Sequence, residues 1–248
     1  MWVNIRIRII PLKPINILFE DEYYLAVDKP SGVLSIPNRD QSEEDIFTYL
    51  AKKYDDLKLV HRIDRETSGV LIFAKGTDAQ RALSILFEHH TIFKEYIAIV
   101  SNIPRESEGT IDNFIDEHPN LKRTYRVAYH GKGKQAVTHY QVLEKYKRHC
   151  LMSYQIETGR THQIRVHSAF LGCPLGFDPI YNPQNGIFIS QLKRNYKSNE
   201  DERSIIQRLS LHASILRFYH PFTNEVVDIQ SPYPKDFHKA MEILRKYI

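Results

Sequence analysis

The sequence predicts an α+β fold in which a mixed, largely antiparallel sheet is flanked by helices. Two observations lead to this prediction. Short apolar runs, many with a period of two, recur throughout the 248 residues and are typical of strands. They are interleaved with only a few segments of helical periodicity. We find no internal repeat and no linker rich in Gly or Ser, so we expect a single domain over residues 1–248.

The expected strands of the first third of the chain are short. Residues 3–9 alternate between apolar and polar side chains, which predicts a strand with one basic face. The apolar runs 17–19 and 24–27 surround an acidic turn and predict a strand pair. The run 70–74 is rich in branched and aromatic residues, which favours a buried strand over a helix.

Two helices are expected in the same region. Residues 43–54 carry an apolar stripe at helical spacing, and Ser42 opens a pattern close to a capping box. A second capping-box pattern joins Thr77 to Gln80. The stripe that follows it predicts a helix ending near His90.

The middle of the chain is expected to hold one strand, one loop and one hairpin. Residues 94–100 alternate and predict a strand, whereas 101–122 are polar and predict a loop. Segments 123–129 and 134–144 predict a hairpin around the turn 131–133. The hairpin is either a ribbon that contacts phosphates or merely a solvated one, and its basic residues are Lys122, Arg123, Arg126, Lys132 and Lys134.

The last third of the chain returns to alternating strands. Residues 152–156 predict a strand, and 161–171 predict a short helix that ends at a Gly. The segment 183–208 is polar and mixed in charge, so we expect a surface insertion. Residues 211–229 predict a strand, a turn and a second strand, and 235–247 predict a closing helix.

Composition excludes several classes of protein. The 34 Lys and Arg residues exceed the 30 Asp and Glu residues by four, which permits a polyanionic partner without requiring one. Cys150 and Cys173 form no metal motif, and a reduced, cytoplasmic compartment is the simplest expectation. No apolar stretch approaches the roughly 20 residues of a membrane span, and no signal peptide is evident.

Two polar segments are candidates for a functional site. Asp64 lies on the loop ahead of the strand at 70–74, where it either acts in a site or caps a turn. Lys29, at the end of a strand, is either an anion contact or an exposed loop lysine. Residues 160–167 place cations and amides at the start of a helix, which suits anionic groups. His162 and His167 are five residues apart and do not share a helical face, so a zinc site is not expected.

Three motifs together resemble those of the RluA-type pseudouridine synthases. Residues 61–69 (HRIDRETSG) resemble the catalytic motif, 94–98 (KEYIA) the second motif, and 158–167 (TGRTHQIRVH) the third. Their order and approximate spacing also agree, and flanking matches extend the resemblance to roughly residues 15–232. Each motif alone could arise by chance, but all three in order form a strong signal.

The chain departs from the family pattern in places. Ile63 replaces the commoner leucine, and Phe177 and Asn182 stand where glycines are usual. These two residues leave the geometry of the loop after the third motif open. Many relatives carry an N-terminal S4 RNA-binding domain, which we do not expect here.

The resemblance implies a pseudouridine synthase fold with a central active-site cleft and an isomerase that needs no cofactor or metal. It implies that Asp64 is the catalytic carboxylate, that Arg165 pairs with it, and that Tyr96 lines the pocket. Arg62 would fill the place of a flipped base. His61 and His162 have either a packing or a contact role. The residues expected to bind RNA are Arg62, His61, Thr67, Lys29, Arg160, His162 and Lys94.

The expected partner is a structured RNA, a stem-loop of tRNA or rRNA, and the expected state is a monomer away from membranes. The alternative is a catalytically silent RNA-binding or chaperone module on the same fold, against which the intact set of Asp64, Tyr96 and Arg165 argues. The hypothesis of a carboxylate-based glycosidase is weaker, because the second acidic residue that such an enzyme needs has no evident position in the sequence.

Overall fold

The computed structural model describes residues 14–128, 132–184, 186–193, 196 and 202–247. The strand predicted at 3–9 lies outside these residues. The strands are β1 (Asn16–Glu20), β2 (Tyr24–Lys29), β3 (Leu57–Leu59), β4 (Ser68–Lys75), β5 (Phe93–Ser101), β6 (Glu108–Glu117), β7 (Tyr125–Val127), β8 (Lys134–Lys145), β9 (His149–Ile156), β10 (Leu211–Tyr219) and β11 (Val226–Gln230). The helices are α1 (Ile46–Ala51), α2 (Thr77–Glu88), α3 (Gln163–Phe170), α4 (Ile189–Leu192) and α5 (Lys235–Arg245).

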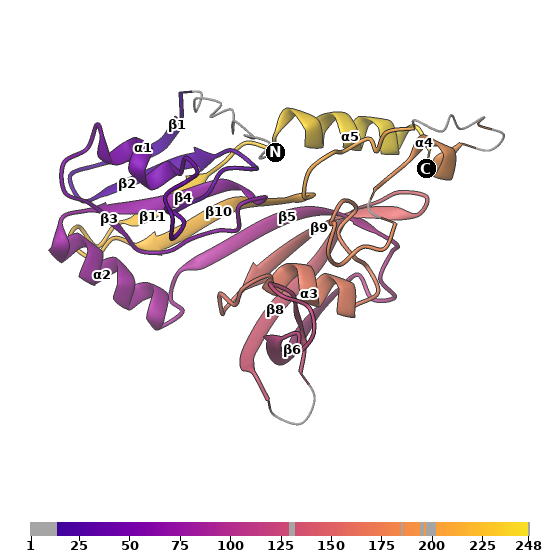
Figure 1. Cartoon of the computed structure of the whole chain (residues 1–248), viewed down its shortest axis with the longest axis horizontal. Helices are drawn as coiled ribbons and strands as arrows, with labels where there is room; N and C mark the ends of the chain where they lie inside the picture. Colours follow the sequence, from indigo (N-terminus) through magenta and orange to yellow (C-terminus); the bar gives the residue numbers. More distant parts are fainter. Residues whose placement is uncertain (1–13, 129–131, 185, 194–195, 197–201, 248) are drawn as a thin grey trace, which may run out of the picture.

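All eleven described strands belong to one sheet (Figure 1). Its order is β1-β2-β4-β10-β5-β9-β8-β6-β7, with β3 beside β4 and β11 beside β10. Among the pairs of described strands, only β10 with β4 is parallel. The prediction of an α+β fold with a mixed, largely antiparallel sheet is confirmed.

Helices cover both faces of the first half of the sheet. The side chains of β2 alternate between the two faces. Tyr24 and Ala26 pack with α2 in one apolar cluster, and Leu25 and Val27 pack with α1 in another. Because both faces are covered, the apolar run 24–27 is continuous rather than alternating.

The second half of the sheet is covered in the same way by α3 and α5 (Figure 1). On β5, Ala98 and Val100 belong to the cluster that holds Ile164 of α3. Ile97 and Ile99 point to the other face, where α5 packs. Tyr96 lies on the α3 face and packs against that cluster.

Two predictions about the middle of the chain are wrong. The expected loop 101–122 contains the strand β6, in which Ile111 and Ile115 are buried. Glu108, Asp112 and Asp116 lie on the opposite face, where Phe114 is 39% exposed, so the apolar side chains of β6 do not keep to one face. The expected hairpin also pairs differently, because β6 inserts between β7 and β8.

Both expected capping boxes are also wrong. Helix α1 begins at Ile46, and the Asp45 side chain, not Ser42, accepts the hydrogen bond from the Thr48 backbone N–H at 2.8 Å. Helix α2 begins at Thr77 after Gly76 and has no side-chain cap. Gln80 instead donates to the Leu59 carbonyl and joins α2 to β3.

The described part of segment 183–208 is anchored as well as polar. Ile187, Leu192 and Ile206 belong to the apolar cluster that packs against α5, and each of these residues is 2% exposed or less. The two strands expected at 211–229 and the closing helix are confirmed as β10, β11 and α5. Within the described part of the chain, no helix combines the length and the apolar character that a bilayer crossing needs.

The two halves of the sheet meet at the start of β4. There Ser68 and Gly69 pair with His212 and Ala213 of β10. Gly69 has φ +109°, and a Cβ at this position would lie 2.1 Å from the Ala213 carbonyl oxygen. Only glycine permits this backbone and this close approach. The loop that enters β4, which carries Asp64, is thereby placed over the middle of the sheet.

Candidate active site

The Asp64 loop is held by the segment that follows β2. The Ser35 hydroxyl donates to the Ile63 carbonyl at 2.8 Å and accepts from the Ile63 N–H at 3.3 Å. The Gly32 N–H donates to the Arg65 carbonyl at 2.9 Å, and the Arg65 side chain donates back to the Gly32 carbonyl at 3.0 Å. The backbone on both sides of Asp64 is therefore fixed by hydrogen bonds from one neighbouring segment.

Lys29 adds to these hydrogen bonds between the two segments, and its side chain does not reach solvent. Its side chain is 0% exposed, and Nζ donates to the carbonyls of Pro30, Val33 and Arg65 at 2.7–2.9 Å. Burial lowers the pKa of Lys29 to about 7, while the three carbonyls use all three N–H groups of the ammonium form. The expected phosphate contact is therefore wrong, and Lys29 positions the Asp64 loop.

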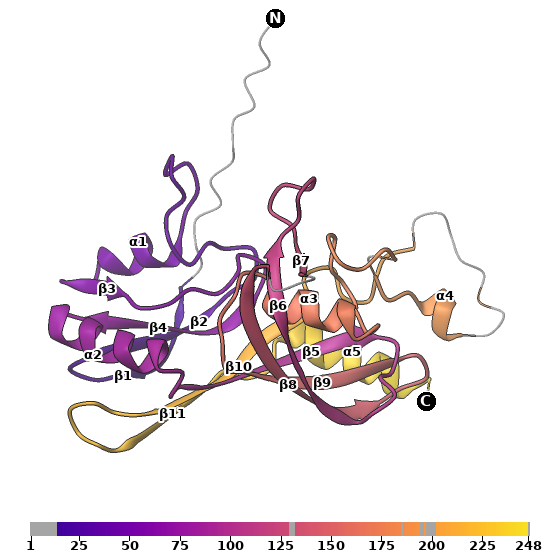
Figure 2. The ribbon, with the colours of Figure 1, turned by 90° about the horizontal axis from the view of Figure 1, so that it is seen from below.

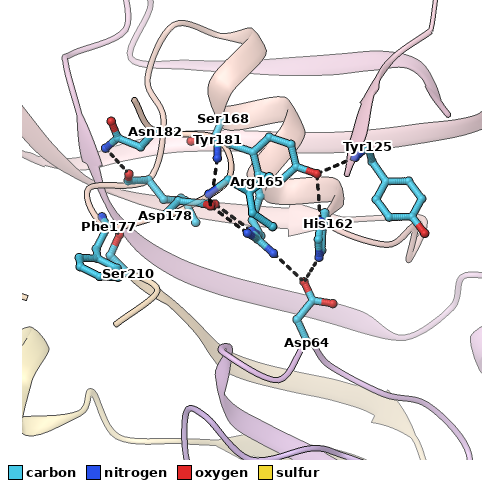
Figure 3. A network of polar contacts seen from close by, with 12 residues as sticks. Asp64, Tyr125, His162, Arg165, Ser168, Phe177, Asp178, Tyr181, Asn182 and Ser210 are labelled. Atoms are coloured by element: carbon cyan, nitrogen blue, oxygen red, sulfur yellow. Dashed lines mark hydrogen bonds and ion pairs between the residues drawn. The ribbon is translucent and has the colours of Figure 1, made fainter. Parts of the chain in front are cut away.

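The Asp64 carboxylate points from this loop toward the start of α3 (Figure 3). Its Oδ2 lies 3.9 Å from Nη1 of Arg165 and 3.9 Å from Nε2 of His162, and the side chain is 22% exposed. The Thr67 N–H donates to the Asp64 carbonyl at 3.1 Å, which closes the turn into β4. One oxygen thus faces two nitrogen groups, and the carboxylate stays accessible.

Arg165 is held mainly by Asp178. Its Nε and Nη2 each donate to the Asp178 carboxylate at 2.8 Å, and both side chains are buried. Asp178 also accepts from the backbone N–H groups of Ile180 and Tyr181. The expected pairing of Arg165 with Asp64 is therefore a longer, secondary contact. A bidentate pair fixes the guanidinium plane, which leaves Nη1 directed at Asp64.

His162 is oriented by two aromatic residues. Its Nδ1 shares a 2.9 Å hydrogen bond with the Tyr181 hydroxyl, which also accepts from the Tyr125 N–H at 2.8 Å. The Tyr125 ring meets the His162 ring edge-on at 5.4 Å. Burial, followed by the charge of Arg165, lowers the pKa of His162, so the ring is neutral at pH 7. His162 precedes α3 with φ +57°, a conformation that is uncommon outside glycine.

These groups line a cavity of about 220 Å³, which we call the catalytic cavity. Tyr96 forms part of its wall, and burial, with the nearby Asp64 charge, raises the pKa of Tyr96 well above its ordinary value. The phenol is therefore neutral. Seven of the ten residues expected from the sequence line this cavity: Arg62, Asp64, Thr67, Tyr96, Arg160, His162 and Arg165.

His61 and Lys94 lie beside the catalytic cavity rather than in it. His61 accepts a hydrogen bond from the Ile72 N–H through Nε2 and stacks on Phe87 at 4.7 Å. Burial lowers the pKa of His61 to about 3, so the ring is neutral. His61 lines a second cavity beside the catalytic cavity, and its expected RNA contact stays a prediction. Lys94 is 8% exposed and donates to the Glu157 carbonyl at 3.3 Å.

Sequence reasoning missed Asp178, Tyr181 and Tyr125. Asp178 and Tyr181 belong to the stretch that follows the third motif. A buried arginine such as Arg165 needs a carboxylate partner, and Asp178 was a candidate close to it in the sequence. Phe177 and Asn182 do not distort this loop, because neither has a positive φ. The Asn182 side chain holds it by donating to the Leu175 carbonyl at 2.8 Å.

Comparison with known proteins identifies the family. The RNA pseudouridylate synthase family matches residues 23–170. Ribosomal large subunit pseudouridine synthase D of Xanthomonas campestris is 34% identical over 239 residues, covering 94% of this chain and 70% of that protein. The uncharacterized RNA pseudouridine synthase YlyB of Bacillus subtilis is 35% identical over 242 residues, covering 94% and 73%.

A solved structure agrees with these relatives. Human RNA pseudouridylate synthase domain containing 4 superposes with a TM-score of 0.72 at 28% identity, covering 93% of each chain. The α+β sheet described above is therefore the fold of a pseudouridine synthase. The chain belongs to the RNA pseudouridylate synthase family, as the resemblance of its three motifs to the RluA type predicted.

Proposed function

We propose that this chain converts a uridine of ribosomal or transfer RNA into pseudouridine, with the Asp64 carboxylate as the reacting group. The observation that carries the proposal is the catalytic cavity, in which Asp64, Tyr96 and Arg165 face one space. Asp64 is the only carboxylate among the described residues that line it. Relatives named for the large ribosomal subunit support rRNA as the substrate.

The proposed reaction is an isomerisation. The bond between C1′ and N1 breaks, the uracil turns, and C1′ forms a bond to C5. C5 loses its hydrogen as a proton and N1 gains one, so atoms and electrons balance without a co-reactant. A carboxylate at Asp64 can attack carbon covalently. Arg165 directs Nη1 toward the reacting oxygen, and the neutral ring of Tyr96 offers the uracil a face on which to stack.

The target uridine must leave its stack to enter the catalytic cavity, which costs a few kcal/mol. Arg62 lies at this cavity, is exposed, and makes no hydrogen bond or ion pair with the rest of the described chain. A planar guanidinium can stack and donate hydrogen bonds, so Arg62 takes the place of the flipped base in the RNA.

A basic extension beside the site would bind the RNA backbone. The end of the sheet formed by β6 and β7 projects away from the rest of the protein, next to α3 (Figure 2). Five exposed cations lie on this extension, and neutralising phosphates would give binding that weakens with salt. They are Lys122, Arg123, Arg126, Lys132 and Lys134. A protein monomer bound to a stem-loop is the arrangement we propose.

Tritium release tests the function. RNA labelled with tritium at C5 of uridine is prepared from cells that lack the gene and is incubated with the purified protein. We expect tritium release from one RNA fraction, with pseudouridine at the position that mapping finds only in cells with the gene. Protein that binds this RNA but releases no tritium from any fraction would be a silent RNA-binding module, and the proposal would fail.

A further inference from the structure

A second cavity adjoins the catalytic cavity, and we call it the flank cavity. It has a volume of about 510 Å³, against about 220 Å³ for the catalytic cavity. Its walls come from the segment before Asp64, the C-terminal end of α2, β5 and the start of the third motif. Five residues line both cavities: Arg62, Tyr96, Ile156, Gly159 and Arg160. The two spaces are therefore neighbours across one shared wall.

One part of the flank cavity is apolar and aromatic. Val60, Phe87 and Ile156 line it. Phe87 is half-buried, and its ring stacks on the His61 ring with 21° between the planes, which fixes its orientation. A fixed aromatic ring on a cavity wall is a stacking surface for a nucleobase and accepts any base.

The other part is cationic. Lys94 is 8% exposed, and its ammonium, which has three N–H donors, makes one hydrogen bond, at 3.3 Å, within the described chain. Arg160 uses Nε on the Gln135 carbonyl at 2.9 Å and keeps its terminal nitrogens free of described partners. Arg62 is exposed and, within the described chain, makes no hydrogen bond or ion pair. Glu88 is the one carboxylate among the described residues that line this cavity.

We propose that the flank cavity binds the nucleotide next to the target uridine. Its base stacks on Phe87, and the phosphodiester that joins it to the target crosses the shared wall between Arg62 and Arg160, within reach of Lys94. The inference rests on the proposed function, because it takes RNA to be the substrate. It adds that two consecutive nucleotides, not one, leave the stack.

The cavities favour a dinucleotide over two separate small ligands. An RNA strand that places one base in the catalytic cavity must continue away from it, and the flank cavity is the adjoining space. Cations on the shared wall match the single negative charge that links two nucleotides. Stacking on Phe87 would be tolerant of sequence, because every base has a π-face.

Abasic RNAs test where the neighbouring base binds. The substrate is the RNA that wild-type protein modifies, with the nucleotide on either side of the target replaced in turn by an abasic ribose. One replacement should lower kcat/KM about tenfold, the scale of one lost stacking contact, and the other should not. In the Phe87→Leu variant, which keeps an apolar side chain, the same replacement should cause no further loss. Equal losses in wild type and Phe87→Leu would overturn the inference.

Charge variants test the phosphodiester. Lys94 Nζ also lies 6.0 Å from the centre of the Phe87 ring, so the Glu88→Gln variant, which leaves that contact in place, is measured beside Lys94→Met. Lys94→Met should lower the affinity for intact RNA severalfold, and Glu88→Gln, at an exposed position, should raise it. Lys239→Met on α5 removes the same charge from an exposed site outside both cavities and serves as the matched control. If Lys94→Met and Glu88→Gln both match this control, the inference fails. Turnover of intact RNA by wild type reports separately on the proposed function, which fails only if that turnover is absent.

Discussion

At the scale of single residues, the site depends on a buried charge pair of which only Arg165 lines the catalytic cavity. Asp178 is buried and binds Arg165 through two hydrogen bonds of 2.8 Å. Arg165 then reaches Asp64 only through Nη1, at 3.9 Å. Asp178 is thus a positioning residue, since it fixes the guanidinium that faces the reacting carboxylate.

Removing the Asp178 charge should impair both stability and turnover. Asp178→Asn leaves Arg165 buried without its counter-charge, which costs about 3–5 kcal/mol in comparable cases. We expect a lower Tm and, in the folded fraction, a kcat reduced at least about tenfold, with the KM for RNA less affected. Thermal unfolding and single-turnover kinetics measure the two effects.

An exposed ion pair supplies the control for Asp178. Arg217 and Asp228 lie 2.6 Å apart with 45% and 33% of their side chains exposed, so Asp228→Asn should cost less than about 1 kcal/mol and leave kcat unchanged. Wild-type stability and kcat in Asp178→Asn would show that Arg165 does not need this partner.

At the scale of elements, the sequence predicted strands whose apolar residues are continuous or strictly alternating. β2, β4, β5, β9 and β10 were all expected for this reason. β6 was missed because its few apolar side chains are split between the two faces, Ile111 and Ile115 on one and Phe114 on the other, among charged and amide side chains. Its position between β7 and β8 is a matter of pairing between distant segments, which local periodicity does not contain.

The same limit applies to the site. Motif order was enough to predict that Asp64, Tyr96 and Arg165 converge, and all three line one cavity. The role of Lys29 was not predictable, because its three carbonyl partners depend on how two loops meet. The predicted caps of α1 and α2 were wrong because several neighbouring residues can cap a helix, and tertiary contacts decide where the helix begins.

At the scale of the whole molecule, stability is linked to pH through four histidines whose pKa values are lowered in the folded chain. Burial lowers the pKa of His61 to about 3 and that of His149, His167 and His212 to about 4, from an ordinary value of 6.5. Between these values the unfolded chain binds protons that the folded chain does not. The free energy of unfolding therefore rises with pH across this window and falls as the solution is acidified below about pH 6.5.

Urea unfolding at pH 7 and pH 5 measures this linkage. Both pH values lie above the ordinary pKa of carboxyl groups, so histidines dominate the difference. We expect lower stability at pH 5, with each of these four histidines contributing on the order of 1–2 kcal/mol. His89 is exposed, and His89→Asn should leave the difference unchanged. Equal stability at the two pH values would mean that these histidines are protonated in the folded chain.

The most direct test of the central claim compares two carboxylates of one loop. Asp64→Asn keeps the shape of the side chain but removes the charge, and Glu66→Gln makes the same change two residues later, where the side chain is 47% exposed. Tritium release from C5-labelled RNA should fall by on the order of a thousandfold or more in Asp64→Asn, while RNA affinity is retained. Glu66→Gln should release tritium at close to the wild-type rate. Full turnover by Asp64→Asn would contradict the assignment of Asp64 as the catalytic carboxylate.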